Sequence, residues 1–277
     1  MDARIVRHGD AQTFLRRART WLLQTEPEHN LILAIAAQAD DCSGLYAATV
    51  EQSGSVVGCA LRTPPRKLVL TRVPPGAVDA LVVDVAACHG ELPAVFGPPA
   101  AAREFARQWC DRRGCTARDG MEQRLYRLDR VTPPSRAPNG ALRFASSADV
   151  GLVASWVACF STETGTGIAA TRQWVAARIA AGDMALWCDG EARTLAGISG
   201  RSPNGVRIGY VYTPPEWRGR GYASACVAAL SQHALDHGAR FCCLYTDLAN
   251  PVSNTIYQRL GYAPVCDAVD IAFVVAA

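Results

Sequence analysis

The segment from Thr213 to Ala223, Thr-Pro-Pro-Glu-Trp-Arg-Gly-Arg-Gly-Tyr-Ala, constrains the fold of this 277-residue chain more than any other. The residues before it, 207–212, are rich in β-branched and aromatic types, and two prolines end the run because proline cannot donate to a strand ladder. After it, residues 222–237 repeat small and apolar side chains three and four positions apart, and Gly238 supplies a helix stop. The pattern predicts a strand, a glycine turn and a helix in direct succession.

This glycine turn has the composition of an anion-binding loop. The first amides of a helix point at one spot, together with the positive end of the helix dipole. Gly219 and Gly221 let the backbone approach a ligand closely, and Arg218 and Arg220 add positive charge. A Walker A lysine and a G-x-G-x-x-G spacing are both missing, which argues against a P-loop nucleotidase and a dinucleotide fold. A phosphate is the expected ligand, and an ordinary surface turn is the alternative.

A second strand-to-helix segment follows. Residues 240–246 have the composition of a strand, and Asn250 has the residue type of an N-cap for the next helix. Gly261 is the expected end of that helix. Ser253 and Tyr257 are four residues apart and therefore share one helix face. For Tyr257, an ordinary aromatic residue that packs on the sheet is the alternative interpretation.

The two motifs together resemble the GNAT superfamily of N-acetyltransferases. They are P-x-x-R-G-x-G-x-A at residues 215–223 and N-x-x-S-x-x-I-Y-x-x-x-G-Y at residues 250–262. Both keep the family's order and internal spacing, and the resemblance covers residues 143–277. It implies the family's α/β fold, acetyl-CoA as the cosubstrate and acyl transfer to an amine.

The resemblance also implies roles for individual residues. The expected pyrophosphate-binding residues are Arg218, Gly219, Arg220, Gly221, Tyr222 and Ala223. The strand end whose main chain pairs with pantetheine and steadies the thioester carbonyl is matched by Val211, Tyr212 and Thr213. Asn250 matches the asparagine that bonds the pantetheine arm, and Ser253 belongs to the same motif.

Tyr257 matches the tyrosine that lies near the thioester sulfur, where a neutral phenol would protonate the departing thiolate. The amine would attack the thioester directly in a ternary complex, and a strand-end amide would stabilise the oxyanion. The expected acceptor is a small-molecule amine. Two alternatives are a protein N-acetyltransferase and a non-catalytic acyl-CoA-binding sensor or structural module. Tyr210 and Tyr212 alternate onto one strand face, where they either line the acceptor site or pack in the core.

The base that deprotonates the amine is less visible. Glu163 is the first candidate, because it follows the first helix of the second half in an expected loop, where related folds build the acceptor pocket. Glu216 lies beside the glycine turn and Asp247 ends the neighbouring strand, so either could act through a water. All three also have ordinary explanations as solvated loop carboxylates.

Composition narrows the functional class. A net charge of +3 is too small to imply a nucleic-acid partner. No apolar run approaches the ~18 residues that a membrane helix needs, and the polar N-terminus lacks signal-peptide features, so a cytoplasmic enzyme without a membrane partner is expected. The eleven cysteines contain no C-x-x-C pair and are expected to be mostly buried free thiols. Cys266 lacks an evident histidine partner, and His233 and His237 lack an evident third ligand, so no metal is expected.

Two domains are expected. The proline-rich linker 131–141 separates a first domain, residues 1–130, from a second, residues 142–277. The second is expected to contain strands at 141–144, 184–188, 194–200, 206–212 and 268–275, and helices at 150–160 and 171–181, in addition to the motif segments. These strands are expected to form a single mixed sheet with helices on both faces, and the site to open where the strands that carry Tyr212 and Tyr245 splay.

The first half shows a faint repeat of the second. A Pro-Pro pair at 74–75 precedes a helix pattern, a strand and a second helix opened by Pro99. Phe105 stands six residues after Pro99, where Tyr257 stands six residues after Pro251, and the glycine turn is missing. The expected fold class is α/β (α+β), with two tandem GNAT-like domains, each a mixed, mostly antiparallel sheet flanked by helices. The first would be a degenerate copy without the acyl-CoA loop, and an unrelated α/β domain is the alternative.

Overall fold

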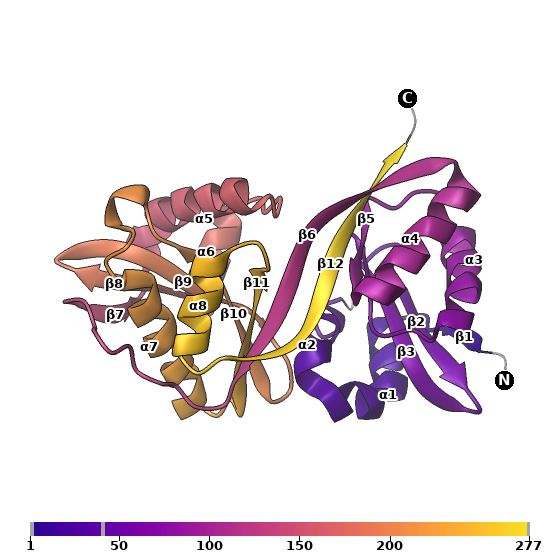
Figure 1. The fold of residues 1–277 in the computed structure, drawn as a ribbon, viewed down its shortest axis with the longest axis horizontal. Helices are drawn as coiled ribbons and strands as arrows, with labels where there is room; N and C mark the ends of the chain where they lie inside the picture. Colours follow the sequence, from indigo (N-terminus) through magenta and orange to yellow (C-terminus); the bar gives the residue numbers. More distant parts are fainter. Residues whose placement is uncertain (1–2, 40–41, 276–277) are drawn as a thin grey trace. The chain divides into compact units, whose positions relative to one another are not determined.

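The computed structural model describes residues 3–39 and 42–275 (Figure 1). Its contacts divide the chain into two compact units. The first unit comprises Met1–Leu125, Thr246–Asn250 and Val265–Ala277, and the second comprises Tyr126–Tyr245 and Pro251–Pro264. This division follows space rather than sequence, so it differs from the expected boundaries at the C-terminal end of the chain.

The first unit contains a sheet with the strand order β1-β2-β3-β4-β5-β12, in which β12 is Ala263–Val275. All neighbouring pairs are antiparallel except β4 and β5, which are parallel. The elements are β1 (Arg4–Arg7), α1 (Ala11–Leu22), α2 (Glu26–Ala36), β2 (Tyr46–Gln52), β3 (Ser55–Arg62), β4 (Leu68–Leu70), α3 (Val78–Cys88), β5 (Ala94–Gly97) and α4 (Pro99–Arg113).

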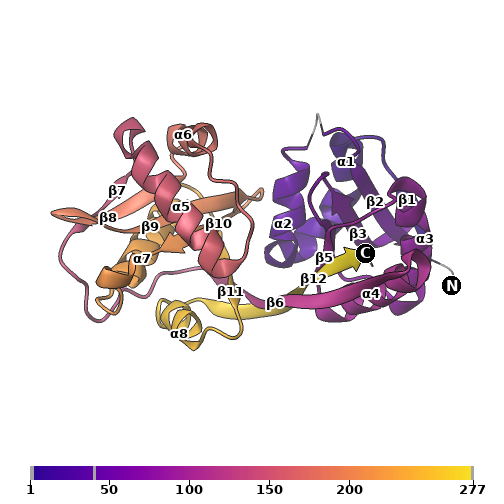
Figure 2. The same cartoon turned by 90° about the horizontal axis from the view of Figure 1, so that it is seen from above.

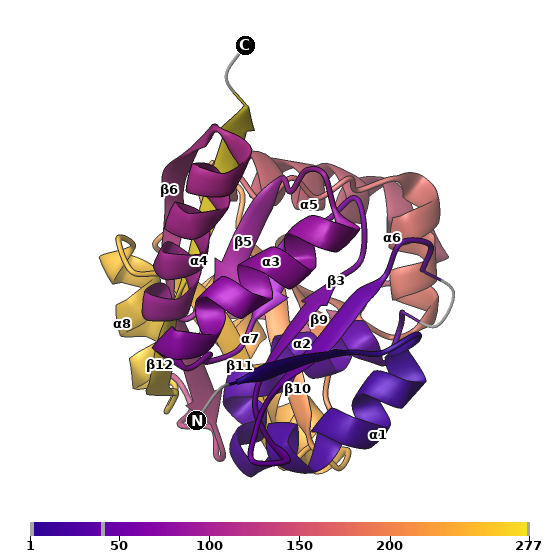
Figure 3. The same cartoon turned by 90° about the vertical axis from the view of Figure 1, so that its right-hand side faces the viewer.

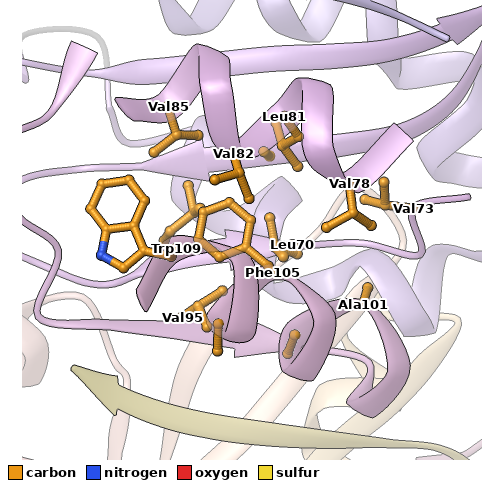
Figure 4. Packing of buried hydrophobic residues seen from close by; sticks show 14 of the residues in the cluster. Leu70, Val73, Val78, Leu81, Val82, Val85, Val95, Ala101, Phe105 and Trp109 are labelled. Carbon is orange, nitrogen blue, oxygen red and sulfur yellow. The ribbon is translucent and has the colours of Figure 1, made fainter. Parts of the chain in front are cut away.

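The core of the first unit lies between this sheet and the helices α3 and α4, which cover one of its faces (Figure 3). Phe105 and Trp109 of α4 are fully buried and stack at 6.0 Å between centroids. They pack with Val82 of α3 and Val95 of β5 (Figure 4). Phe105, the counterpart of Tyr257 in the repeat, is therefore a core residue.

The second unit contains a sheet in the order β11-β10-β9-β8-β7. β10 and β11 are parallel, and the other neighbours are antiparallel. The elements are β7 (Ala141–Phe144), α5 (Val150–Thr164), α6 (Arg172–Ala180), β8 (Met184–Asp189), β9 (Glu191–Arg201), β10 (Gly205–Tyr212), α7 (Tyr222–Asp236), β11 (Phe241–Asp247) and α8 (Pro251–Arg259).

Strand alternation in the second unit gives each sheet face its own core. Ala185 and Trp187 of β8 pack with α7, while Met184 and Leu186 pack with α5 and α6. Figure 2 labels these three helices around the strands of the second unit. The expected helices on both faces are confirmed. Within the described ranges, no helix has both the length and the apolar character needed to cross a membrane.

The two units repeat one arrangement of elements, which confirms the tandem fold. In the first unit β4, α3, β5 and α4 follow one another, and in the second unit β10, α7, β11 and α8 do the same. In both cases the two strands are parallel and joined through a helix. Each series ends in a long strand, which is β6 (Cys115–Leu128) or β12 (Ala263–Val275).

The expectation that residues 268–275 complete the sheet of the second half is wrong. β12 pairs antiparallel with β5, where Val269 lies opposite Gly97 and Ile271 opposite Val95. The side chains of Val269 and Ile271 are fully buried in the core of the first unit. Their alternation predicts a strand with one apolar face but does not indicate which of two sheets receives it.

Candidate active site

An interruption in β10 marks the candidate site. Gly209 pairs with Gly197 and Tyr212 with Leu195, so β10 carries one residue more than β9 across this interval. Tyr210 has a φ of 55°, a left-handed conformation that costs a non-glycine residue about 1–2 kcal/mol. The Tyr210 ring makes T-shaped contacts with the rings of Phe160 and Trp174. Such bulges often redirect a strand beside a functional site.

β10 and β11 also separate at this end, as expected from the sequence. Their recorded pairing covers only residues 205–207 with residues 241–243 in the described part of the chain. Tyr212 and Tyr245 lie beyond it. Val211, between the bulge and the strand end, is skipped in the register with β9, whereas the carbonyl of Tyr212 accepts a hydrogen bond from the Thr194 hydroxyl at 2.7 Å. Val211 therefore lies within β10 without a paired residue in β9, and Thr213 lies beyond the end of the strand.

The predicted phosphate turn has the geometry of an anion cradle. Gly219 and Gly221 have φ values of 75° and 84°, which favour glycine, and Gly221 is the N-cap of α7. No side chain caps this helix, so its first amides, beginning with those of Tyr222 and Ala223, have no partner within the helix. A Cβ at Gly219 would meet nothing within 4 Å. The open turn, free donors and helix dipole fit a pyrophosphate.

The two arginines of the turn have different environments. Arg218 donates from Nε to the Thr213 carbonyl at 2.8 Å and from one terminal nitrogen to both carboxylate oxygens of Glu163, at 2.7 and 2.9 Å. The positive charge that the sequence predicts at Arg218 is therefore paired with Glu163. Arg220 is exposed and lies 4.8 Å from the ring of Trp217.

Glu163 lies in α5 and not in a loop, which corrects the expectation. The helix continues to Thr164 and ends at Gly165, whose φ is 63°. The Thr164 hydroxyl donates a hydrogen bond to the Phe160 backbone carbonyl at 2.7 Å, so this polar side chain finds its partner within the helix. Arg218 engages both carboxylate oxygens, so Glu163 is held in an ion pair beside the turn.

Tyr257 lies on α8, and its ring meets that of Tyr262 at 5.9 Å. Burial raises the pKa of Tyr257 to about 12, so the phenol keeps its proton at neutral pH. In the described part of the chain its hydroxyl makes no recorded hydrogen bond. Tyr257 and Val211 pack against the same hydrophobic cluster, which brings the predicted acid and the predicted strand end onto one core.

Tyr126 orients α8, and the sequence analysis did not identify it. Its buried hydroxyl donates to Asn254 and accepts from the Gln258 side chain, both at 3.1 Å. Gly261 ends the helix with a φ of 97°, and a Cβ there would lie 2.9 Å from the Arg130 carbonyl. A lone tyrosine far from both motifs carries no pattern that predicts this contact.

The remaining predicted residues have simpler surroundings. Ser253 is half-buried in the first turn of α8. Asn250 directly precedes α8, and its backbone amide donates to the Asp247 carbonyl at 3.1 Å. Asn250 and Asp247 are grouped with the first unit by their contacts. Glu216 lies exposed in the turn Pro215–Trp217. Tyr222 bonds through its hydroxyl to Asp189 at 2.7 Å, which leaves its backbone amide for the cradle.

The cysteine and histidine alternatives gain no support. Burial raises the pKa of Cys266 to about 11, which disfavours the thiolate that a nucleophile needs. The rings of His233 and His237 stack at 3.9 Å, and no third ligating side chain joins them among the described residues. All eleven cysteines are free; Cys59, Cys226, Cys242 and Cys243 are buried, while Cys88 and Cys159 are exposed.

Comparisons with known proteins bear on the family and the fold. The sequence profile of the Acetyltransferase (GNAT) family matches residues 155–262. No curated protein sequence matches this chain significantly. A GCN5-related N-acetyltransferase from Sphaerobacter thermophilus has 16% identity and a TM-score of 0.66, with 99% of this chain and 96% of the other covered.

Two further solved structures span the whole chain. A GNAT-family acetyltransferase from Colwellia psychrerythraea has 14% identity and a TM-score of 0.58, with 98% of this chain and 100% of the other covered. A tandem GNAT protein from the clavulanic acid biosynthesis pathway has 14% identity and a TM-score of 0.51, with 100% and 99% covered. These likenesses concern the fold, and the family profile covers the cradle and α8. Residues 155–262 therefore form a domain of the GNAT family of acetyltransferases.

Proposed function

We propose that the protein transfers an acetyl group from acetyl-CoA to the primary amine of a small molecule, by direct attack in a ternary complex. The observation that carries the proposal is the left-handed glycine pair at the start of α7, which follows an interrupted strand end at Val211. An anion cradle and an uncommitted strand end in succession suit a ligand that carries both a pyrophosphate and an extended arm.

Residues of the second half of the sequence would divide the work. The amides after Gly219 bind the pyrophosphate, with the α7 dipole adding to their attraction. The main chain of Val211 pairs with the extended arm and steadies the carbonyl oxygen of the thioester. Asn250 and Ser253, at the start of α8, contact the same arm. Acetyl-CoA supplies an activated acetyl group whose sulfur leaves as a thiolate.

Tyr257 is the proposed general acid. With a pKa of about 12 the phenol is fully protonated at pH 7, and its hydroxyl has no recorded partner in the described chain that would compete for the proton. The apolar surroundings that raise this pKa also disfavour a bare thiolate, because both groups are anionic when deprotonated. Glu163 is the proposed base once Arg218 releases it, and Glu216 and Asp247 are the alternatives.

Catalysis is proposed for the second half of the sequence, residues 142–277. In the corresponding turn of the first unit, Gly76 lacks a left-handed φ and lies within the short helical turn Pro75–Ala77, and the residue at the position of Tyr257 is the buried Phe105. The first unit thus has the fold without the cradle or the acid. We retain residues 131–141 as the proposed boundary, a cytoplasmic location, and no nucleic-acid or membrane partner.

The experiment is a thiol-release assay with acetyl-CoA and a panel of amines. Amine-dependent release of coenzyme A, with an acetylated product in mass spectrometry, supports the proposal. Binding of coenzyme A without release across small amines favours a sensor or structural module. Release only with a peptide or protein acceptor favours a protein N-acetyltransferase.

A further inference from the structure

Aromatic side chains gather on the face of β10 that α5 and α6 cover. Ring centroids of Tyr212 and Trp156 lie 6.3 Å apart, and those of Tyr210 lie 6.3 Å from Phe160 and 5.7 Å from Trp174. These five residues are here named the aromatic cluster. Tyr212 is buried, but the other four residues are only half-buried, so each keeps part of its surface exposed to solvent.

The cluster stands beside the residue that would hold the thioester. Tyr210 and Tyr212 are the two neighbours of Val211 in the chain, and both side chains face α5. This step rests on the proposed function, in which the main chain of Val211 steadies the reacting carbonyl. An acceptor that reaches this carbonyl from the α5 side therefore meets aromatic surface.

The charges at the cluster select against a polycation. Two cations are recorded in contact with its rings in the described structure. Arg178 lies 5.9 and 6.0 Å from Trp174 and Tyr210, and Arg218 lies 5.8 Å from Tyr212. The carboxylates beside these arginines, Asp183 and Glu163, are already paired with them. A second ammonium group on the acceptor would meet the like charges of Arg178 and Arg218.

We propose that the acceptor is a monoamine with a flat aromatic body, an arylalkylamine, whose ring packs against the aromatic cluster. Offset or edge-to-face packing of the ligand ring against Phe160 and Trp174 orients the amine toward the thioester. In the reaction the amine lone pair forms the new C–N bond and the C–S bond breaks. One amine proton is lost to the base, and the thiolate takes a proton from Tyr257.

Steady-state kinetics test this proposal with 2-phenylethylamine, tryptamine, methylamine and spermidine as acceptors. The two aryl amines should have the highest kcat/KM. Phe160→Leu and Trp174→Leu, which replace a ring by an aliphatic side chain, should each raise KM for 2-phenylethylamine about threefold to tenfold, the range that an aromatic pair contributes. The KM for acetyl-CoA should stay within about twofold, because neither residue belongs to the cradle. Leu152→Ala, at an exposed position on α5 outside the cluster, is the matched control and should change neither constant.

The failures of the two proposals are distinguishable. A preference for spermidine, or an unchanged KM for 2-phenylethylamine in both variants, overturns the aromatic acceptor while acetyl transfer stands. If no amine gives thiol release, the proposed function fails, and binding still tests the cluster. Saturable quenching of tryptophan fluorescence by 2-phenylethylamine with coenzyme A present would then support the aromatic site, and its absence would overturn it.

Discussion

The substitution Gly221→Ala tests the phosphate cradle without a steric clash inside the protein. The nearest atoms to a Cβ at this position are Pro138 Cδ at 3.7 Å and the Arg136 carbonyl oxygen at 3.9 Å, so the fold has room for the methyl group. The cost comes from the φ of 84°, which is worth about 1–2 kcal/mol for an L-residue. We therefore expect a folded variant with a modest loss of stability.

The expected effect on binding is larger. Either the methyl group covers the open side of the turn or the backbone leaves its left-handed conformation, and both changes remove hydrogen bonds from amides to phosphate. Each such bond to a charged group is worth about 1.5–3 kcal/mol, so the loss of one raises the Kd for coenzyme A about tenfold to 100-fold. Isothermal titration calorimetry with coenzyme A measures this change directly.

Gly238→Ala is the matched control at the other end of α7. Gly238 has a φ of 99° and nothing within 4 Å of an added Cβ, so the substitution carries the same kind of strain far along the helix from the cradle. Both variants should lose similar stability in circular dichroism melts, and only Gly221→Ala should lose affinity. Equal affinities in the two variants would refute the placement of the cradle.

Three further predictions follow from single groups. Tyr257→Phe should lower kcat about 100-fold or more, as expected for loss of a general acid. Its stability should change little, because the Tyr257 hydroxyl has no hydrogen-bond partner in the described part of the chain. The control Tyr262→Phe removes a buried 2.8 Å hydrogen bond to Ser231, so it should lower stability and leave kcat unchanged. Because burial raises the pKa of Tyr257 to about 12, kcat measured up to pH 10 should show no alkaline fall from this group, and a fall centred near pH 10 that is absent from Tyr257→Phe would contradict the raised pKa. Asp149→Asn should lower the free energy of unfolding at pH 7 by about 1–2 kcal/mol, because the carboxylate accepts hydrogen bonds from Arg143 and from the backbone amide of the N-cap residue Ser146. Arg143 lowers the pKa of Asp149, so the difference between variant and wild type should shrink as the pH falls below 4. Denaturant titrations at pH 7 and pH 3 measure this difference.

Much of the second unit could be predicted from the sequence because its signals are local. A left-handed turn needs glycine, and the residues at 219, 221 and 261 have the positive φ values that their neighbours implied. The periodicity of residues 222–237 is that of one helix, and α7 spans Tyr222–Asp236. These features depend on a few adjacent residues, which a single sequence contains.

Other parts depend on partners far along the chain and could not be predicted. The pairing of β12 with β5 joins residues that lie more than half the chain apart, and the hydroxyl of Tyr126 orients α8 across 128 residues. The end of α5 was missed because Thr162 and Thr164 resemble loop residues until their hydroxyls bond back to the helix. The first unit's strands β1, β2 and β3 carry no motif that separates them from other apolar runs.

The most direct test of the central claim is the rate at which coenzyme A is released from acetyl-CoA with and without 2-phenylethylamine, measured for the wild type and for Tyr257→Phe. We predict amine-dependent release with an N-acetylated product in the wild type, and a strongly reduced rate with unchanged KM for acetyl-CoA in the variant. No amine-dependent release by a wild-type protein that binds coenzyme A would contradict an acetyltransferase role, and equal rates in the two proteins would remove Tyr257 from the chemistry.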